Sequence, residues 1–495
     1  MLTKRRFRYL ILCLFPAMAA QAQTFTGYHT SQYAGIHAVP FNPALAAGTR
    51  YKWDVNIIGA DVKAGNTYYS FMKSSLFSTQ EKMVRNVDYI PDTNATRRQY
   101  GWGSGEIMLP SVLFSIDERQ SFAFTWRVRG SANAGGVETS VANFFSLSYP
   151  NPRFFNRNIA SKYAAGNGHV WNEFGFSYAR VIKDEGDHRW KAGVTLKYLG
   201  GQAAAYTSVR DASFTFNSRE LADINSARVY YAYNEELDEI TDNDWQSAYN
   251  PFQNPGIGAD IGIVYEWRPD NDGFGSMHEG GPDWNPDADT WKARFAASVV
   301  DIGGIKYRKA PASANIDMTA NNVLVRSLNK QRGESLRRYA TRMATMFTPM
   351  ENEDTYYMNL PTSLNLMGDY NFNGRFFLSA SATVALTGGE KDDNKTSALT
   401  QLTITPRYEA RSLGLYLPIS VNRYGQADAG FALRAGPLVI GSASLFSTLA
   451  RQMINHADVF VALRIVPIRL GKWSWDKGSD GTYRKRRNQT GCPDL

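Results

Sequence analysis

Charged side chains recur at alternate positions within apolar stretches of this 495-residue sequence. In residues 190–198, Lys191 and Lys197 alternate with an apolar set that carries an aromatic ring at each end. Because successive side chains of a strand point to opposite faces, one face is charged and the other apolar. Such a charged face can bind or guide a solute. We expect it to set the polarity of a barrel lumen at Arg127, Arg129, Lys191, Lys197, Asp260, Glu266 and Arg464.

Catalytic motifs are missing from the sequence. The chain has six histidines and none of the common metalloprotease, serine hydrolase or nucleotide-binding patterns in a fitting context. We therefore expect a protein that is not an enzyme and needs no cofactor. The acidic stretch 268–290 could bind Ca²⁺, although a solvated turn explains it better, and we predict no metal site there; its acidic residues are Asp270, Asp272, Asp283, Asp287 and Asp289.

The N-terminus has the three parts of an export signal. Four basic residues precede an apolar run, and Ala20 and Ala22 then supply the small-residue cleavage pattern. We predict a signal peptide over 1–22. A lipoprotein signal at Cys13 is the alternative, but Leu12 is too large for that cleavage. Removing the signal leaves Cys492 as the one cysteine, so no intrachain disulfide is expected.

The alternating pattern of 190–198 is repeated along the chain. Similar stretches occupy 121–129, 170–178, 257–267, 291–299, 375–386 and 457–468. At 9–12 residues they are longer than typical globular strands and suit tilted membrane strands. A soluble antiparallel sandwich also alternates, but the charged inner face suits a lumen and the aromatic ends suit a bilayer interface. The sequence predicts an all-β fold, a transmembrane antiparallel β-barrel over 51–469.

Connection lengths predict about 14 strands. Short turns fall at 117–120, 183–188, 373–374, 410–412 and 436–437, whereas long connections fall at 63–104, 135–168, 201–255 and 305–355. In outer-membrane barrels the short turns and both termini face the periplasm, so we predict a cell outer membrane location. The stretch 268–290 is an exception, because it is long on the side of the short turns.

The segment before the first strand lacks the strand pattern. Residues 37–48 contain Pro40 and Pro43, and we predict that residues 23–50 enter the lumen. The run Asn42-Pro43-Ala44 resembles the start of the long-chain fatty-acid transporter family (FadL) and of the type IX secretion barrel PorV, both 14-stranded with an N-terminal segment inside. The FadL resemblance implies a plug or gate role for Asn42, Pro43 and Ala44. A capped turn leading into the first strand is an equally good interpretation.

The rest of the chain resembles an outer-membrane barrel family known only as a domain of unknown function. The similar stretches are YEWRPD (265–270), DIGGIKY (301–307), LPTSLN (360–365), PRYEAR (406–411), GLYLPISVN (414–422) and LRAGPLVIGS (433–442). Residues 470–495 resemble a degenerate linker of the type that precedes OmpA-like domains. Asp476 and Asp480 offer too few oxygen donors for calcium, so a periplasmic tail without metal is expected.

Two functional hypotheses remain open. In the first, the barrel is a FadL-like passive channel for small or hydrophobic solutes. In the second, it is a non-transporting, partner-binding barrel, either a PorV-like secretion accessory or an envelope-anchoring module. The expected partners are outer-membrane lipid and lipopolysaccharide, with a periplasmic or secretion-system protein as a further candidate. A predicted helix in 329–347 carries four arginines that could contact lipopolysaccharide, although a solvated loop helix explains it better. The net charge of +8 lies partly in the terminal segments, so no nucleic acid is expected.

Overall fold

The structure is a computed structural model that describes residues 25–76, 83–117, 119–146, 152–237, 249–269, 291–331, 333–388 and 393–466. The predicted signal peptide and the predicted tail lie outside the described residues, as do the five aspartates of the acidic stretch. No helix among the described residues is long and apolar enough to span a membrane.

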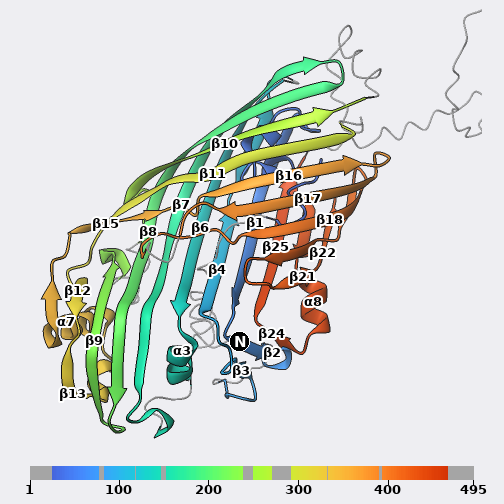
Figure 1. Cartoon of the computed structure of the whole chain (residues 1–495). Helices are drawn as coiled ribbons and strands as arrows, with labels where there is room; N and C mark the ends of the chain where they lie inside the picture. The colour runs from blue at the N-terminus through green and yellow to red at the C-terminus, as the bar shows by residue number, and fades with distance from the viewer. Residues whose placement is uncertain are drawn as a thin grey trace, which may run out of the picture.

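One antiparallel sheet closes into a ring, because β1 pairs with β4 and β5 on one side and with β25 on the other (Figure 1). When interrupted strands are counted once, the ring has about 14 wall strands, which confirms the predicted number. In order they are β1 (Trp53–Asn66), β4 (Gln99–Met108) with β5 (Ser111–Ser115), β6 (Gln120–Val137), β7 (Asn158–Glu185), β8 (His188–Phe216), β10 (Pro255–Trp267), β11 (Ala293–Arg308), β15 (Thr355–Asn359) with β16 (Ser363–Asn371), β17 (Phe376–Ala385), β18 (Gln401–Glu409), β19 (Leu413–Tyr416) with β20 (Ile419–Asn422), β21 (Ala427–Ala429) with β22 (Phe431–Ala435), β23 (Leu438–Ser442) and β25 (His456–Ile465).

The two faces of the wall follow the alternation in the sequence. On β8, Leu196 is 65% exposed whereas Thr195 is 2% exposed, and their neighbours Phe176 and Ser177 on β7 divide in the same way. Trp190 and Tyr198 lie outside, at the two ends of the apolar stretch of β8. An apolar outer band with aromatic ends is what lipid contact requires, so the wall spans a membrane.

The long connections gather at one end of the barrel, which we name the long-loop end. Parts of the predicted connections 135–168, 201–255 and 305–355 form strands at this end. The connections were therefore predicted too long, and the strands beside them too short. β7 and β8 have 28 and 29 residues and project beyond the ring (Figure 1). Their backbone groups continue to pair, since β9 lies against β8 and β12 and β13 lie against β9. The added elements are β9 (Leu221–Tyr233), β12 (Ala314–Asp317), β13 (Ala320–Leu324), α6 (Val325–Leu328), α7 (Leu336–Met346) and β14 (Thr348–Met350).

Smaller elements complete the long-loop end. α3 (Thr139–Ser146) and η4 (Pro152–Phe154) connect β6 to β7. A three-stranded sheet is formed by β2 (Tyr69–Met72), β3 (Tyr89–Pro91) and β24 (Met453–Ile454). Two further helices, α2 (Lys73–Leu76) and α8 (Leu445–Ala450), follow β2 and β23 in the chain.

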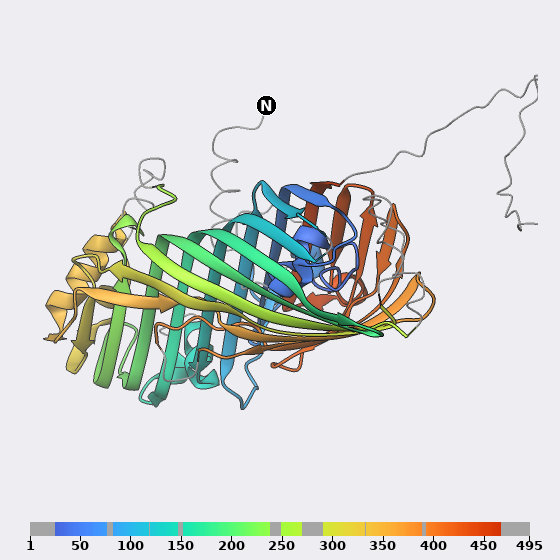
Figure 2. The same ribbon diagram turned by 90° about the horizontal axis from the view of Figure 1, so that it is seen from above.

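Residues 25–50, which we name the N-terminal plug, lie inside the ring near the opposite, short-turn end (Figure 2, blue). The plug contains two short turns, η2 (Gly35–Ala38) and η3 (Pro43–Ala46). Its apolar side chains pack against inward-facing wall residues, Phe25 against Phe460 and Tyr28 against Tyr416. Since these plug and wall residues share one buried cluster, the core of the protein lies between plug and wall.

Candidate functional site

Asn42 holds the plug to the wall. Its side-chain oxygen accepts a hydrogen bond from Ala44 N at 2.9 Å, which caps η3, and Pro43 at the first position needs no amide partner. The side-chain amide donates at 3.1 Å to the carbonyl of Ile263 on β10 and at 3.1 Å to that of Ala297 on β11. Asn42, which is buried, therefore both caps the turn and holds it to the wall, and the plug or gate role stays a prediction.

Two glycines of the wall make room for this turn. A Cβ built on Gly193 of β8 would lie 2.4 Å from Ala44 N, and one built on Gly262 of β10 would lie 2.1 Å from the Asn42 oxygen. Any larger residue at either position would collide with the plug. The glycines on the charged face of β8 and β10 therefore form the surface against which the plug packs.

Charged wall residues bind the opposite side of the plug. Arg464 donates to the hydroxyl of Tyr28 at 2.6 Å and to the carbonyl of Tyr33 at 2.6 Å. The same guanidinium forms an ion pair with Asp54 of β1 at 3.1 Å, and Asp54 accepts the backbone N–H of Ile36 at 2.9 Å. Arg464 therefore faces the interior as expected, but it contacts the plug rather than an open lumen.

Next to the plug lies a set of buried charges that we name the ion-pair layer. It contains three cations and four carboxylates from six neighbouring strands: Glu106, Arg127, Arg129, Glu173, Lys197, Asp260 and Asp301. Arg129 binds both oxygens of Asp301, at 2.7 and 2.8 Å. Lys197 lies 2.6 Å from Asp260 and 2.6 Å from Asp301. Each of these charges except Asp260 pairs with at least two opposite charges of the layer, and Asp260 pairs with Lys197.

The structure places all seven predicted lumen residues inside the ring but divides them among three groups. Arg127, Arg129, Lys197 and Asp260 belong to the ion-pair layer. Lys191 and Glu266 form a separate pair at 2.6 Å beside the plug, and Arg464 contacts the plug from the other side. Each of the seven side chains is buried and ion-paired, and their role in setting the polarity of the lumen stays a prediction.

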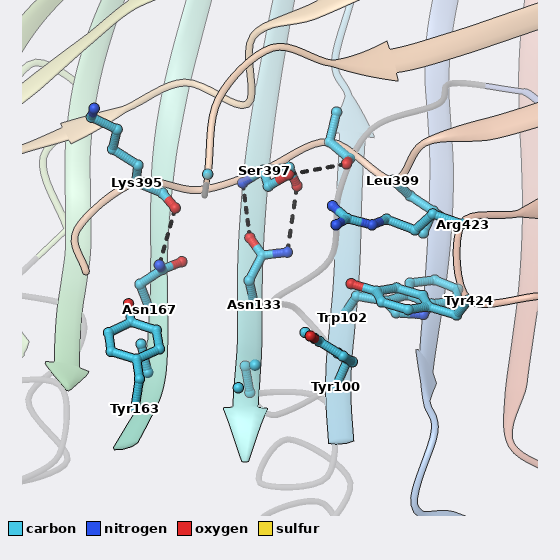
Figure 3. Close-up of a pocket in the computed structure, with 16 residues that line it drawn as sticks. Tyr100, Trp102, Asn133, Tyr163, Asn167, Lys395, Ser397, Leu399, Arg423 and Tyr424 are labelled. Atoms are coloured by element: carbon cyan, nitrogen blue, oxygen red, sulfur yellow. Dashed lines mark hydrogen bonds between the residues drawn. The ribbon is translucent and has the colours of Figure 1, made fainter. Parts of the chain in front are cut away.

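A second obstruction crosses the barrel nearer the long-loop end. We name residues 393–400, in the connection from β17 to β18, the infolded segment. Asn133 of β6 accepts the N–H of Ser397 at 3.0 Å, and Asn167 of β7 donates to the carbonyls of Asp393 and Lys395 at 3.1 Å (Figure 3). On the far side, Asn359 of β15 donates to the carbonyl of Thr396 at 3.0 Å. The segment is therefore tied to opposite parts of the wall.

The infolded segment forms one side of a cavity of about 130 Å³, which we name the mouth cavity (Figure 3). Its walls combine four aromatic rings with amide and cationic side chains: Tyr100, Trp102, Tyr163, Tyr424, Asn133, Asn167, Lys395 and Arg423. Tyr100 and Tyr424 stack with ring centroids 5.2 Å apart.

A larger and mainly apolar cavity of about 650 Å³ lies in the projecting part of the sheet. We name it the apolar cavity; it is lined by β8, β9, β12 and α7, through residues that include Val209, Phe214, Ala227, Ile316 and Met343. In α7, Arg342 donates to Glu334 at 2.9 and 3.0 Å. These hydrogen bonds lower the pKa of Glu334 to about 2, so the pair that fixes this helix stays charged near neutral pH.

Several residues of these sites were not predicted. Glu106, Glu173 and Asp301 complete the ion-pair layer, and a charge at an inward strand position was the available signal. Asn133 and Asn167 interrupt strand-forming stretches, where asparagine is uncommon. In the part of the chain that the structure describes, no group of three His, Cys, Asp or Glu side chains is arranged to hold a metal ion.

Residues 43–443 match a protein family described as a family of unknown function, DUF5723. This match confirms the resemblance found in the stretches between 265 and 442. No curated protein matches the chain.

Three of the solved structures that match this chain share about a tenth of their residues with it. The deltaS2 mutant of the monoaromatic hydrocarbon channel TodX has 10% identity and a TM-score of 0.41, with 87% of this chain and 94% of that chain covered. The P. putida toluene transporter TodX has 11% identity and a TM-score of 0.39 over the same shares. The Ralstonia pickettii toluene transporter TbuX has 9% identity and a TM-score of 0.29, with 87% and 93% covered.

Proposed function

This chain belongs to the family of unknown function DUF5723, and from that premise and its own geometry we propose that it is an outer-membrane barrel for the passive uptake of small hydrophobic solutes. In this proposal the short turns face the periplasm and the long-loop end faces the outside. A solute first enters the apolar cavity, passes into the barrel when the infolded segment moves aside, and leaves at the short-turn end when the plug moves.

The apolar cavity is the observation that carries the proposal. Its volume of about 650 Å³ lies in the range of small-molecule sites. The side chains around it are mainly aliphatic or aromatic, with Phe214, Ile224 and Met343 among them. Each methylene group of a solute buried there contributes about 0.8 kcal/mol, so an alkyl chain gains affinity without any polar contact.

The plug supports a gated rather than a permanently open channel. Asn42, Pro43 and Ala44 close the short-turn end of the barrel in this account, and their contacts are hydrogen bonds and small apolar surfaces that can be broken and remade. Buried ion pairs at Arg127, Arg129, Lys197 and Asp260 keep the wall rigid while the plug moves. Lys191, Glu266 and Arg464 hold the resting position of the plug.

Filling the apolar cavity tests this function. The substitution Ala227→Phe places a ring in space that the alkyl chain of dodecanoate would occupy. Displacing roughly two methylenes makes the binding free energy less favourable by about 1.6 kcal/mol. This change corresponds to about a tenfold loss of affinity. Equilibrium dialysis of labelled dodecanoate against protein in nanodiscs, with empty nanodiscs as background, measures the change.

Ser226→Phe is the matched control, because Ser226 is the adjacent residue of β9 and is exposed. It adds the same ring outside the cavity and is expected to leave binding unchanged. Equal affinity in both variants would contradict a role of the cavity in solute capture.

A partner-binding barrel is the second candidate. The barrel interior contains the plug, the ion-pair layer and the infolded segment in succession, and this succession favours a barrel that does not conduct. In that case the projecting sheet would be a contact surface for a secreted or envelope protein. Dodecanoate binding without dodecanoate uptake by cells would favour this second function.

A further inference from the structure

The infolded segment crosses the barrel interior without forming a strand of the sheet. In residues 393–398 the described structure contains a single isolated β-bridge, between Lys395 and Asn359. Asn133 of the wall instead bonds both backbone groups of Ser397, accepting its N–H at 3.0 Å and donating to its carbonyl at 3.4 Å (Figure 3). Neighbouring strands of the ring share continuous rows of backbone hydrogen bonds, whereas this segment is tied at separate points. It can therefore detach while the ring stays intact.

Asp393 binds three donors of the projecting strands. One of its oxygens accepts the hydroxyl of Tyr163 on β7 at 2.9 Å. The other accepts the hydroxyl of Ser208 at 2.7 Å and the guanidinium of Arg210 at 2.7 Å, both on β8. The carboxylate side chain is 12% exposed, so little water competes with these donors. Because hydrogen bonds to an ionised group are about twice as strong as neutral ones, Asp393 is the strongest attachment among the described contacts of the segment.

Two cavities adjoin the infolded segment and leave room for it to move. Residues 397–399 line the mouth cavity of about 130 Å³. Asp393 and Asn394 line a second cavity of about 560 Å³, together with side chains of β8 and β9. A segment packed at the usual density of a protein interior has no such space beside it. Displacement of this segment therefore requires that its polar contacts break, but not that the sheet rearranges.

We propose that the infolded segment is an inner gate and that Asp393 is its latch. When the contacts of Asp393 break, the segment separates from β7 and β8 and opens the path from the long-loop end towards the ion-pair layer. This inference rests on the proposed function, because it names the contact that regulates entry of the solute into the barrel. The inner gate and the plug then lie in series, so the barrel can admit a solute without forming a continuous pore.

Thiol labelling of a buried residue in the segment tests the latch. Ala398 is buried, so a cysteine at this position reacts with a maleimide only when the segment leaves the wall. The full chain in nanodiscs carries Ala398→Cys, and its natural cysteines, Cys13 and Cys492, are replaced by serine. We expect Asp393→Asn to raise the labelling rate about tenfold, the effect of losing one hydrogen bond to a charged group. An unchanged rate would overturn the proposal.

A second reporter distinguishes release of the segment from loss of the fold. Ala462 of β25 is buried beside the plug, and Ala462→Cys is expected to react slowly with or without Asp393→Asn. Equal acceleration at both reporters would contradict the proposal, since the substitution would then loosen the whole barrel rather than one segment.

Asp211→Asn is the matched control for Asp393→Asn. Asp211 also pairs with an arginine of the projecting strands, Arg228, but both side chains are exposed to solvent. Exposed pairs contribute little, so no change in labelling at Ala398→Cys is expected. If Asp211→Asn accelerated labelling as much as Asp393→Asn, the effect would come from the charge of the projecting sheet, and Asp393 would not be the latch.

Equilibrium dialysis of dodecanoate against the same variants separates the inner gate from the proposed function. We expect Asp393→Asn to leave dodecanoate affinity unchanged, because the apolar cavity is intact. Unchanged labelling with normal dodecanoate binding would remove the inner gate and leave solute capture standing. Faster labelling of a protein that binds no dodecanoate, with or without Asp393→Asn, would support the latch and contradict solute capture.

Discussion

Deleting residues 25–50 is expected to convert a silent barrel into one that shows discrete conductance steps in planar bilayers. The plug fills the ring near the short-turn end, where Asn42, Arg464 and Asp54 are among the residues that make its polar contacts with the wall. Water and ions fill the space once the segment is absent. The deletion also removes apolar packing against Phe460 and Tyr416, so a lower unfolding temperature is expected together with the conductance.

A variant of unchanged length provides the control for this deletion. Replacing residues 25–50 by a Gly/Ser sequence of the same length removes the contacts but keeps the tether, and flickering conductance is expected. Silence of the deletion variant, in protein shown to be inserted and folded, would mean that the ion-pair layer and the infolded segment close the barrel without the plug.

The second large effect is expected at Glu173. This carboxylate lies 2.7 Å from Arg129 and also contacts Arg127. Glu173→Gln keeps the size of the side chain but leaves three cations with one fewer buried countercharge. Removing one partner of a buried ion pair lowers the free energy of unfolding by about 3–5 kcal/mol. Urea unfolding of protein in lipid vesicles, followed by tryptophan fluorescence, measures the loss.

Glu185→Gln is the matched control for Glu173→Gln. Glu185 lies on the same strand and pairs with Lys183 at 3.1 Å, but the two side chains are 72% and 56% exposed. Exposed pairs contribute at most about 1 kcal/mol. If the two variants unfolded at the same urea concentration, the ion-pair layer would contribute no more to stability than a surface pair.

The transmembrane wall could be predicted from the sequence because each membrane strand repeats one simple pattern. A period of two places Leu196 outside and Lys197 inside. The face toward lipid needs apolar side chains, whereas the face toward the lumen carries polar and charged ones. The projecting parts of β7 and β8 obey a different rule. Their apolar side chains, such as Val209 and Phe214, face a cavity within the protein rather than lipid, so the pattern of a membrane strand does not mark these stretches.

The contents of the lumen could be predicted less well. The position of Asp301 beside Arg129 depends on how β6 and β11 face each other across the ring, which no local pattern encodes. The infolded segment likewise depends on Asn133 and Asn167, two side chains from strands more than 200 residues away in the chain. Asn42 and Pro43 had a more specific local signal, because they match the cap and the first position of a short helical turn.

Movement of the plug is the central claim, and a reversible cross-link tests it most directly. The hydroxyl oxygens of Thr30 in the plug and Ser379 in β17 lie 3.0 Å apart, so cysteines at both positions can form a disulfide. Whole-cell uptake of labelled dodecanoate is measured in a Gram-negative host without its own fatty-acid channel, before and after reduction, with each single-cysteine variant as control. We predict that oxidation stops uptake and that reduction restores it. Uptake at the wild-type rate through fully cross-linked protein would contradict the account.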